Sequence, residues 1–274
     1  MIYLPKVYGT CFGSNRAINL AYEKKDENIC VYKEILHNEE LIKDLEKNGI
    51  YCVDKIPKDK TVIIRAHGEA KEVFDYLNDN NIKYYDATCP NVKRVQRLIN
   101  EHYVYGINIV IFGKKNHPEV IGENGWCDNK AIIIENKEDI NKITEDNLFI
   151  VVQTTYNEDL ALEIVEEIKS KFNEVKFVNT ICNAQKLNQE HAMKLAKDMD
   201  YMIVIGGKKS SNTKELYKAC ESICKSYLVS SKEELKEILK EIDLNLKIGI
   251  TAGASTPGFQ VEEYIEIIKN FNNF

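Results

Sequence analysis

The segment that begins at Tyr84 reads Y-Y-D-A-T-Cys89-P-N-V-K-R-V-Q-R-L, a strand-like run that ends in a cysteine and passes into a helix-like run. The same order of features recurs at Cys11, in V-Y-G-T-Cys11-F-G-S-N, and at Cys182, in F-V-N-T-I-Cys182-N-A-Q. A repeat of roughly 80 to 95 residues is longer than a solenoid period and is typical of a repeated α/β unit. The chain is therefore predicted to consist of three copies of one module.

Composition excludes several classes of protein. With 274 residues, of which 44% are hydrophobic, the chain is long enough to bury a large core. It carries 37 basic and 43 acidic residues without a basic stripe, so we expect no nucleic-acid partner. The opening residues, 1–6, do not resemble a signal peptide, and no apolar run approaches membrane-spanning length. We therefore expect no membrane association and a cytoplasmic location, where eight cysteines favour metal binding or catalysis over disulfides.

Each repeat alternates apolar strands with amphipathic helices. Strands are predicted at 29–32, 62–64, 107–112, 149–152, 202–205 and 248–250, and helices at 16–22, 72–78, 92–103, 159–172, 186–199 and 261–271. Continuous apolar strands between helices indicate parallel sheets that are covered on both faces. The sequence thus predicts an α/β fold of three small modules, with mainly parallel sheets around a pseudo-threefold axis and a central cleft. The predicted boundaries are 1–89 with an N-terminal strand, 90–181 and 182–274.

The three repeated cysteines, Cys11, Cys89 and Cys182, are candidate ligands of a metal or cluster. A thiolate is the ligating form, and a helix N-terminus lowers the pKa of a thiol. Three protein ligands would leave one position of the bound group open for a substrate. The alternative is three unrelated buried cysteines, because free cysteine is often buried and no C-x-x-C pair marks a zinc or ferredoxin-type site. Five further cysteines fall outside the repeated position and are predicted to be structural: Cys30, Cys52, Cys127, Cys220 and Cys224.

Polar side chains follow the predicted strands at the edge where ligands bind in parallel sheets. They are His37, His67, His117, Thr154, Thr155, Ser210, Ser211, Asn212 and Ser255. Imidazoles and hydroxyls near helix N-termini describe an anion pocket, which suits phosphate or diphosphate. For any single histidine, the alternative is an ordinary loop or core residue. His102 and His191 fall within predicted helices and are expected at the surface.

Glu119 is the candidate proton donor. It lies in His117-Pro118-Glu119-Val120, a more apolar setting than that of Glu39, which is predicted to be solvated. A carboxyl group in a closed, partly apolar cleft keeps its proton and delivers it to a substrate. The alternative is an unremarkable surface glutamate.

At these residues the sequence resembles the 4-hydroxy-3-methylbut-2-enyl diphosphate reductase family of the non-mevalonate isoprenoid pathway. The resemblance runs over nearly the whole chain, in one order of short motifs. These are Cys11-Phe12-Gly13, His37-Asn38, Ala66-His67-Gly68, Asp86-Ala87-Thr88-Cys89-Pro90, His117-Pro118-Glu119-Val120, Gln153-Thr154-Thr155, Thr180-Ile181-Cys182, Ser210-Ser211-Asn212 and Thr251-Ala252-Gly253-Ala254-Ser255.

The resemblance implies a [4Fe–4S] cluster that is held by Cys11, Cys89 and Cys182 and has one iron without a protein ligand. It implies that a diphosphate is gripped by His37, His67, His117, Ser210, Asn212 and Ser255, with Ser211 beside them. Glu119, aided by the Thr154 region, would relay protons. The reaction would be a two-electron reductive dehydroxylation that yields isopentenyl and dimethylallyl diphosphates. Electrons would come from a ferredoxin or a flavodoxin, because no flavin or nicotinamide motif is visible.

Five positions depart from the family pattern: Ser14, Arg65, Asn91, Gln185 and Asn188. Polar groups near cluster ligands change the hydrogen bonding of the sulfurs and hence the potential. Lineage drift is one explanation. The other is a paralogue, a related iron–sulfur reductase or dehydratase with a different anionic substrate. A non-catalytic iron–sulfur sensor is a third reading, against which the retained Glu119 counts, and a zinc-binding structural protein is a fourth.

Overall fold

The computed structural model describes residues 1–36, 38–208 and 210–271. The chain forms two compact units. The first comprises Met1–Asn15, Leu36–Lys47 and Asn183–Phe274, and the second Arg16–Ile35 and Asn48–Cys182. Within the described residues there are three sheets of four strands each, and every strand pair is parallel. The predicted fold class of three parallel-sheet α/β modules is confirmed, whereas the module boundaries stay a prediction.

Helix α1 (Phe12–Glu23) contributes residues to both units. The other elements of the first unit are β1 (Ile2–Tyr3), α2 (Glu39–Lys47), α7 (Ala184–Ala196), β10 (Tyr201–Ile205), α8 (Ser211–Glu221), β11 (Lys225–Val229), α9 (Lys232–Glu241), β12 (Ile248–Ala252) and α10 (Gly258–Phe271). The second unit contains β2 (Ile29–Tyr32), β3 (Tyr51–Val53), β4 (Thr61–Ile64), α3 (Lys71–Asp79), β5 (Tyr84–Asp86), α4 (Pro90–Val104), β6 (Asn108–Phe112), α5 (Pro118–Asn124), the 3-10 helices η1 (Gly125–Cys127) and η2 (Lys137–Lys142), β7 (Ile132–Ile134), β8 (Leu148–Val152), α6 (Glu158–Lys171) and β9 (Val175–Phe177).

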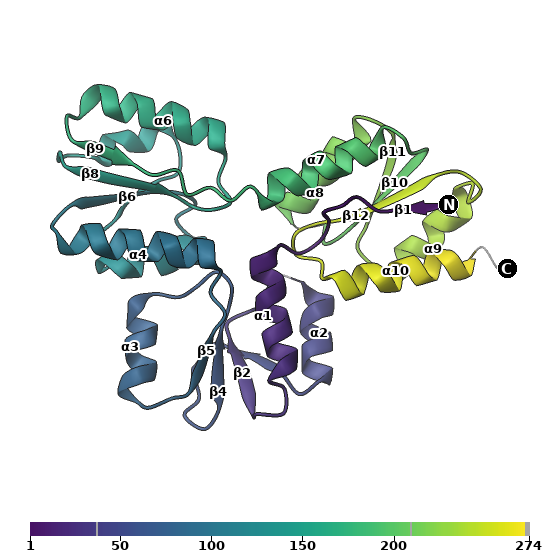
Figure 1. Ribbon diagram of the computed structural model, residues 1–274, viewed down its shortest axis with the longest axis horizontal. Helices are drawn as coiled ribbons and strands as arrows, with labels where there is room; N and C mark the ends of the chain where they lie inside the picture. Colours follow the sequence, from purple (N-terminus) through teal and green to yellow (C-terminus); the bar gives the residue numbers. More distant parts are fainter. Residues whose placement is uncertain (37, 209, 272–274) are drawn as a thin grey trace. The chain divides into compact units, whose positions relative to one another are not determined.

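The sheet of the first unit has the strand order β1-β12-β10-β11 and is covered on both faces. Ile203 of β10 packs with Leu235 of α9 and Val261 of α10. The neighbouring Val204 points to the opposite face and packs with Leu216 of α8. Figure 1 shows α9 and α10 on one side of these strands and α7 and α8 on the other. Successive strand residues face opposite sides, so a strand covered on both sides is apolar throughout.

The second unit holds two sheets, β3-β2-β4-β5 and β7-β6-β8-β9. In the latter, Val110 of β6 packs with Ile164 of α6, and the adjacent Ile111 packs with Ile99 of α4 on the other face. Figure 1 shows α6 and α4 on opposite sides of β6 and β8. In the former sheet, strands β2 and β4 pack against α3. None of the described helices has the length and apolar character that crossing a membrane requires.

The strand-like run predicted before Cys11 is wrong, because the structure has a loop there. Pro5 has no backbone N–H to donate to a ladder, and Gly9 adopts a positive φ of 70°, which favours glycine. The loop is held instead by two backbone bonds, from Gly9 N to Ala252 O and from Thr10 N to Thr256 O, both 3.0 Å long. The N-terminal strand is β1, which pairs with β12 through Ile2 and Ile248.

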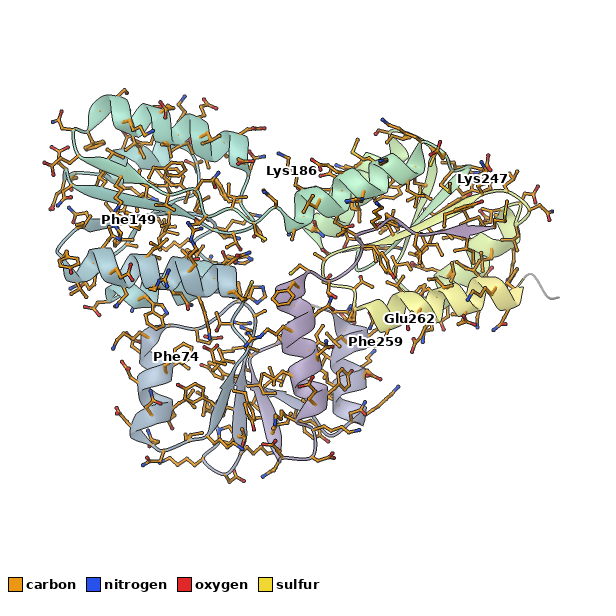
Figure 2. The ribbon with its side chains drawn as sticks, viewed as in Figure 1. Phe74, Phe149, Lys186, Lys247, Phe259 and Glu262 are labelled. Atoms are coloured by element: carbon orange, nitrogen blue, oxygen red, sulfur yellow. The ribbon has the colours of Figure 1, made fainter. Side chains whose placement is uncertain are left out.

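Phe149 of β8, labelled in Figure 2, anchors the packing between β8 and α4. The ring is fully buried and stacks on His102, with ring centroids 3.5 Å apart. His102, predicted at the surface, is half-buried in this stack. We expect Phe149→Ala to lower the free energy of unfolding by about 3–5 kcal/mol, because it leaves a cavity in a closed core. Chemical denaturation measures this loss, and Phe149→Leu should cost less; equal losses would contradict the cavity argument.

Candidate active site

In the second unit, three strands from two sheets end next to the candidate residues. Strand β4 leads to His67, β6 leads to His117 and Glu119, and β8 leads to Thr154. Strands β6 and β8 end in register, with Phe112 opposite Val152. The rings of His67 and His117 meet edge to face, with centroids 5.6 Å apart. Parallel neighbours such as β6 and β8 bring their carboxyl ends to one edge of the sheet, whereas His67 reaches this edge from the end of a strand in the other sheet.

Glu119 is held in place from two sides. It lies in the first turn of α5, where the Nδ1 of the N-cap His117 accepts a hydrogen bond from Glu119 N at 3.2 Å. One carboxylate oxygen accepts from Thr154 N at 2.5 Å, and the other accepts from the Thr154 hydroxyl at 2.8 Å. Glu119 is 2% exposed and Thr154 is 5% exposed. The surface-glutamate alternative is therefore wrong.

Burial and hydrogen bonding shift the pKa of the Glu119 carboxyl in opposite directions. Loss of solvation raises the pKa of Glu119 above its ordinary value, and the two bonds from Thr154 lower it in part. One helical turn later, Glu123 is fully buried, and burial raises its pKa well above the ordinary value, with the Glu119 charge adding to the shift. A carboxyl whose pKa is raised by burial is suited to hold and deliver a proton near neutral pH.

Two of the candidate cysteines lie close to these residues in the second unit. Cys89 is the N-cap of α4, and its N–H donates to Ala66 O at 3.0 Å. Asn91, in the first turn of that helix, donates from Nδ2 to the Cys182 Sγ at 3.3 Å. The backbone N–H of Cys182 donates to Thr154 O at 2.7 Å. Hydrogen bonds thus connect Cys182 both to the first turn of α4 and to Thr154, the residue that donates to the Glu119 carboxylate.

In the first unit, candidate residues follow the neighbouring strands β10 and β12. Ser210 caps α8, with its hydroxyl accepting from Thr213 N at 3.3 Å. Asn212 Nδ2 is buried and has no hydrogen-bond partner among the described residues. Ser255 O accepts from Asn38 Nδ2 at 2.8 Å. Buried donors are normally hydrogen-bonded, so the unsatisfied amide of Asn212 beside the capping Ser210 is suited to bind an anion.

Cys11 immediately precedes α1 in the first unit. Its Sγ lies 3.5 Å from the hydroxyl oxygen of Ser14, which is 9% exposed. If Cys11 is a thiolate, it has no proton, so the Ser14 hydroxyl is the donor in this contact. The adjacent Thr10 and Asn15 hydrogen-bond to each other through their side chains.

The structure shows contacts of some predicted site residues that the sequence did not indicate. For the other residues, the role in the site stays a prediction. Thr155 is exposed and accepts from Gln153 Nε2 at 2.8 Å. Ser211 is the first residue of α8, and His37 lies outside the described residues. Neither unit by itself gathers three described His, Cys, Asp or Glu side chains into a metal site. The convergence of the three cysteines, two of which belong to the second unit, stays a prediction.

The five departures from the family pattern have different surroundings. Ser14 and Asn91 contact cysteine sulfurs. Arg65 instead forms a buried ion pair with Glu69 at 3.1 Å. Asn188 donates to Ala252 O at 3.0 Å in the first unit. Gln185 lies in the first turn of α7, and nothing in the structure explains its identity.

Two polar residues near the site were not predicted. Glu123 follows Glu119 by four positions, a spacing that puts both on one face of a helix and was available in the sequence. Gln153 joins two loops, because its Oε1 accepts from Lys114 N at 3.0 Å and its Nε2 donates to Thr155. Gln153 belongs to the motif Gln153-Thr154-Thr155, but nothing in that motif indicates that its side chain joins two loops.

Three of the five cysteines predicted to be structural are fully buried: Cys30, Cys127 and Cys220. Burial raises the pKa of the Cys127 thiol to about 11 and that of Cys220 to about 12. Such thiols stay protonated at neutral pH and are poor ligands. This observation agrees with a structural role for these three.

Comparisons of the sequence and of the structure with known proteins point to one family. A family model described as LytB protein matches residues 2–269. The chain is 44% identical to a 4-hydroxy-3-methylbut-2-enyl diphosphate reductase of Caldanaerobacter subterraneus subsp. tengcongensis, over 96% of this chain and 94% of that protein. It is 40% identical to the Clostridioides difficile protein of that name, over 98% and 99% of the two chains. A solved structure of (E)-4-hydroxy-3-methyl-but-2-enyl diphosphate reductase superposes with a TM-score of 0.83 at 38% identity, covering 98% of this chain and 99% of the other.

Proposed function

Because the chain belongs to the LytB protein family, we propose that it is a 4-hydroxy-3-methylbut-2-enyl diphosphate reductase of the non-mevalonate pathway. The observation that carries this proposal is likeness over the whole chain, at 44% identity across 96% of its length. The reaction is an oxidoreduction in which two electrons and two protons replace the substrate hydroxyl by hydrogen and release water. The site chemistry agrees, because a buried acid and a set of anion-binding donors are what this reaction requires.

The residues of the chain have separate tasks in this proposal. The diphosphate is bound by imidazoles and short polar side chains: His37, His67, His117, Thr155, Ser210, Ser211, Asn212 and Ser255. Charge-assisted hydrogen bonds from such donors hold a diphosphate and so orient the carbon chain that reacts. Glu119 carries the proton to the leaving hydroxyl, and the N–H and hydroxyl of Thr154 stabilise the negative charge that then remains on the Glu119 carboxylate.

The iron–sulfur character of the family fits the thiols that the structure presents. We propose that Cys11, Cys89 and Cys182 hold a [4Fe–4S] cluster, which supplies electrons and an open iron as a Lewis acid. Cys89 and Cys182 are half-buried rather than enclosed, unlike Cys30 and Cys127. The electron donor is proposed to be a ferredoxin or a flavodoxin, and the cytoplasm is the proposed location.

Asn91 is expected to raise the reduction potential of this cluster. Its amide donates to the Cys182 sulfur, and such a bond strengthens when the cluster gains negative charge. A difference of about 1 kcal/mol between the two redox states corresponds to about 40 mV for one electron. We therefore expect Asn91→Leu, which keeps the side-chain size, to lower the midpoint potential by about 40 mV. A redox titration followed by electron paramagnetic resonance measures it.

The control for this shift is Asn80→Leu at the exposed C-cap of α3. That substitution should leave the midpoint potential unchanged. Ser14→Val, which removes the hydroxyl beside Cys11, should shift the potential in the same direction as Asn91→Leu. An unchanged potential in Asn91→Leu would show that the amide does not reach the sulfur of the loaded protein.

The assay that tests the proposed function uses protein reconstituted with iron and sulfide without oxygen. A strong one-electron donor and 4-hydroxy-3-methylbut-2-enyl diphosphate are added, and products are identified chromatographically. We expect conversion to both isopentenyl and dimethylallyl diphosphates. An intact, reducible cluster without turnover would reject this substrate and favour a paralogue, for which other anionic allylic alcohols are the next substrates to try.

A further inference from the structure

Glu123 is a buried carboxyl group for which the reaction as described has no use. Its side chain is completely inaccessible to solvent, and neither oxygen has a hydrogen-bond partner among the residues that the structure describes. An ionised carboxylate in such a place carries a large desolvation penalty. A protonated acid does not, so this environment selects the neutral form of Glu123.

Among the residues that the structure describes, the charge that acts on the Glu123 carboxyl is that of Glu119, which is negative and does not compensate it. On its own helix it lies one turn after Glu119, with about 5–6 Å between Cβ atoms at this spacing. One turn further on is Cys127, whose thiol donates to Asn124 O at 3.2 Å. Burial is the main cause that raises the pKa of this thiol to about 11, so Cys127 is neutral beside Glu123 at physiological pH.

The segment after β4 packs against α5, since a side chain at Gly122 would lie 3.4 Å from the Glu69 backbone. The charges of this segment cancel, because Arg65 is paired with Glu69. From α4, the uncharged Gln96 faces the same segment and donates to Glu69 O at 3.3 Å. The histidines at this end of the sheets, His67 and His117, contact each other.

We propose that Glu123 is the second proton store of the active site, a positioning residue that returns a proton to Glu119 after Glu119 has given its own to the substrate. The inference rests on the proposed function, because that reaction consumes two protons in each turnover. Glu119 and Glu123 together hold two, on one face of a short helix and away from solvent.

The transfer balances without a further reactant. Glu119 donates its proton to the hydroxyl that leaves as water, and its carboxylate accepts the two bonds from Thr154. The Glu123 carboxyl then loses its proton and the Glu119 carboxylate gains it, so the single negative charge moves from Glu119 to Glu123. Glu119 gives this second proton to the substrate carbon that lost the hydroxyl, and the pair carries two negative charges until it is reprotonated. Between turnovers, protons from solvent reach Glu119, the more exposed of the two carboxyls, and pass from it to Glu123. Two neighbouring carboxyls that titrate together behave as one unit with two macroscopic pKa values.

Infrared spectroscopy of the cluster-loaded protein tests the first half of the proposal without any turnover. A protonated carboxylic acid has a carbonyl stretch that a carboxylate lacks. The difference spectrum between the natural protein and Glu123→Gln at neutral pH should contain this band. Glu138→Gln, at an exposed carboxylate, is the matched control and should not produce it. Absence of the band in the Glu123 difference spectrum would mean that Glu123 is ionised and would overturn the proposal.

The pH profile of kcat tests the second half. Glutamine keeps the size and neutrality of a protonated Glu123 but has no proton to give, so activity should then follow Glu119 alone. Burial raises both pKa values, but the bonds from Thr154 lower that of Glu119 and the Glu119 charge raises that of Glu123 further, so the alkaline limb should move to lower pH in Glu123→Gln. We expect kcat to fall about tenfold on that limb and to stay within about twofold at acid pH.

A merely structural role for Glu123 would lower kcat equally at every pH, and superimposable or uniformly scaled profiles would therefore overturn the proposal. A natural protein without any turnover would instead refute the proposed function, while the infrared band still reports on Glu123. The two failures are thus distinguishable.

Discussion

Replacing Glu119 by glutamine is expected to lower kcat by about a hundredfold to ten-thousandfold, the usual contribution of a positioned proton donor. The substitution removes the titratable proton and retains an oxygen that accepts from Thr154 N. The fold and the iron content should therefore remain those of the natural protein. Steady-state kinetics with both products quantified gives the result, and iron analysis of the same sample shows that the cluster is intact.

The matched control is Glu138→Gln, at an exposed carboxylate of η2, which should leave kcat unchanged. The variant Thr154→Val tests whether the proton that is delivered to the substrate comes from Glu119. Bonds from Thr154 lower the pKa of Glu119, so removing the hydroxyl should raise that pKa. Activity that requires protonated Glu119 is lost as pH rises through its pKa, so the alkaline limb should move to higher pH in Thr154→Val. Movement to lower pH would contradict the assignment of Glu119 as the acid.

Replacing Cys182 by serine is expected to remove most of the bound iron and sulfide and to reduce turnover to background. Three thiolates are the fewest that hold the proposed cluster with one open iron, and a serine hydroxyl is a poorer ligand for iron in such clusters. Iron and sulfide analysis and the visible absorbance of the anaerobically reconstituted protein measure the loss. Cys89→Ser should behave in the same way.

Cys224→Ser is the control for these variants. Cys224 is also half-buried, but it follows α8 in the first unit and was predicted to be structural. It should retain full iron and activity. A Cys182→Ser protein that keeps the natural iron content and activity would exclude Cys182 as a ligand.

The central strands were predictable because their environment leaves a local signature. Strand β8 (Leu148–Val152) is buried at every residue, and the prediction of 149–152 differs from it by one position. The edge strands β3, β7 and β11 were not predicted. Strand β11 reads Lys225-Ser226-Tyr227-Leu228-Val229, and an edge strand of this kind tolerates polar residues that hide the apolar pattern. Helix α9 was also missed, although Ser231 caps it through Glu234 N, a spacing that marks helix starts.

The sequence by itself determined the threefold α/β plan, the parallel sheets and the family, because hydrophobic periodicity and short motifs are local properties of the chain. It also placed the candidate residues at the carboxyl ends of strands. Only the tertiary structure decided which of them touch. Glu119 meets Thr154 across 35 residues of chain, and Asn91 meets Cys182 across 91. Such contacts depend on how packed helices and sheets bring distant loops together, and so does the burial that keeps a proton on Glu123.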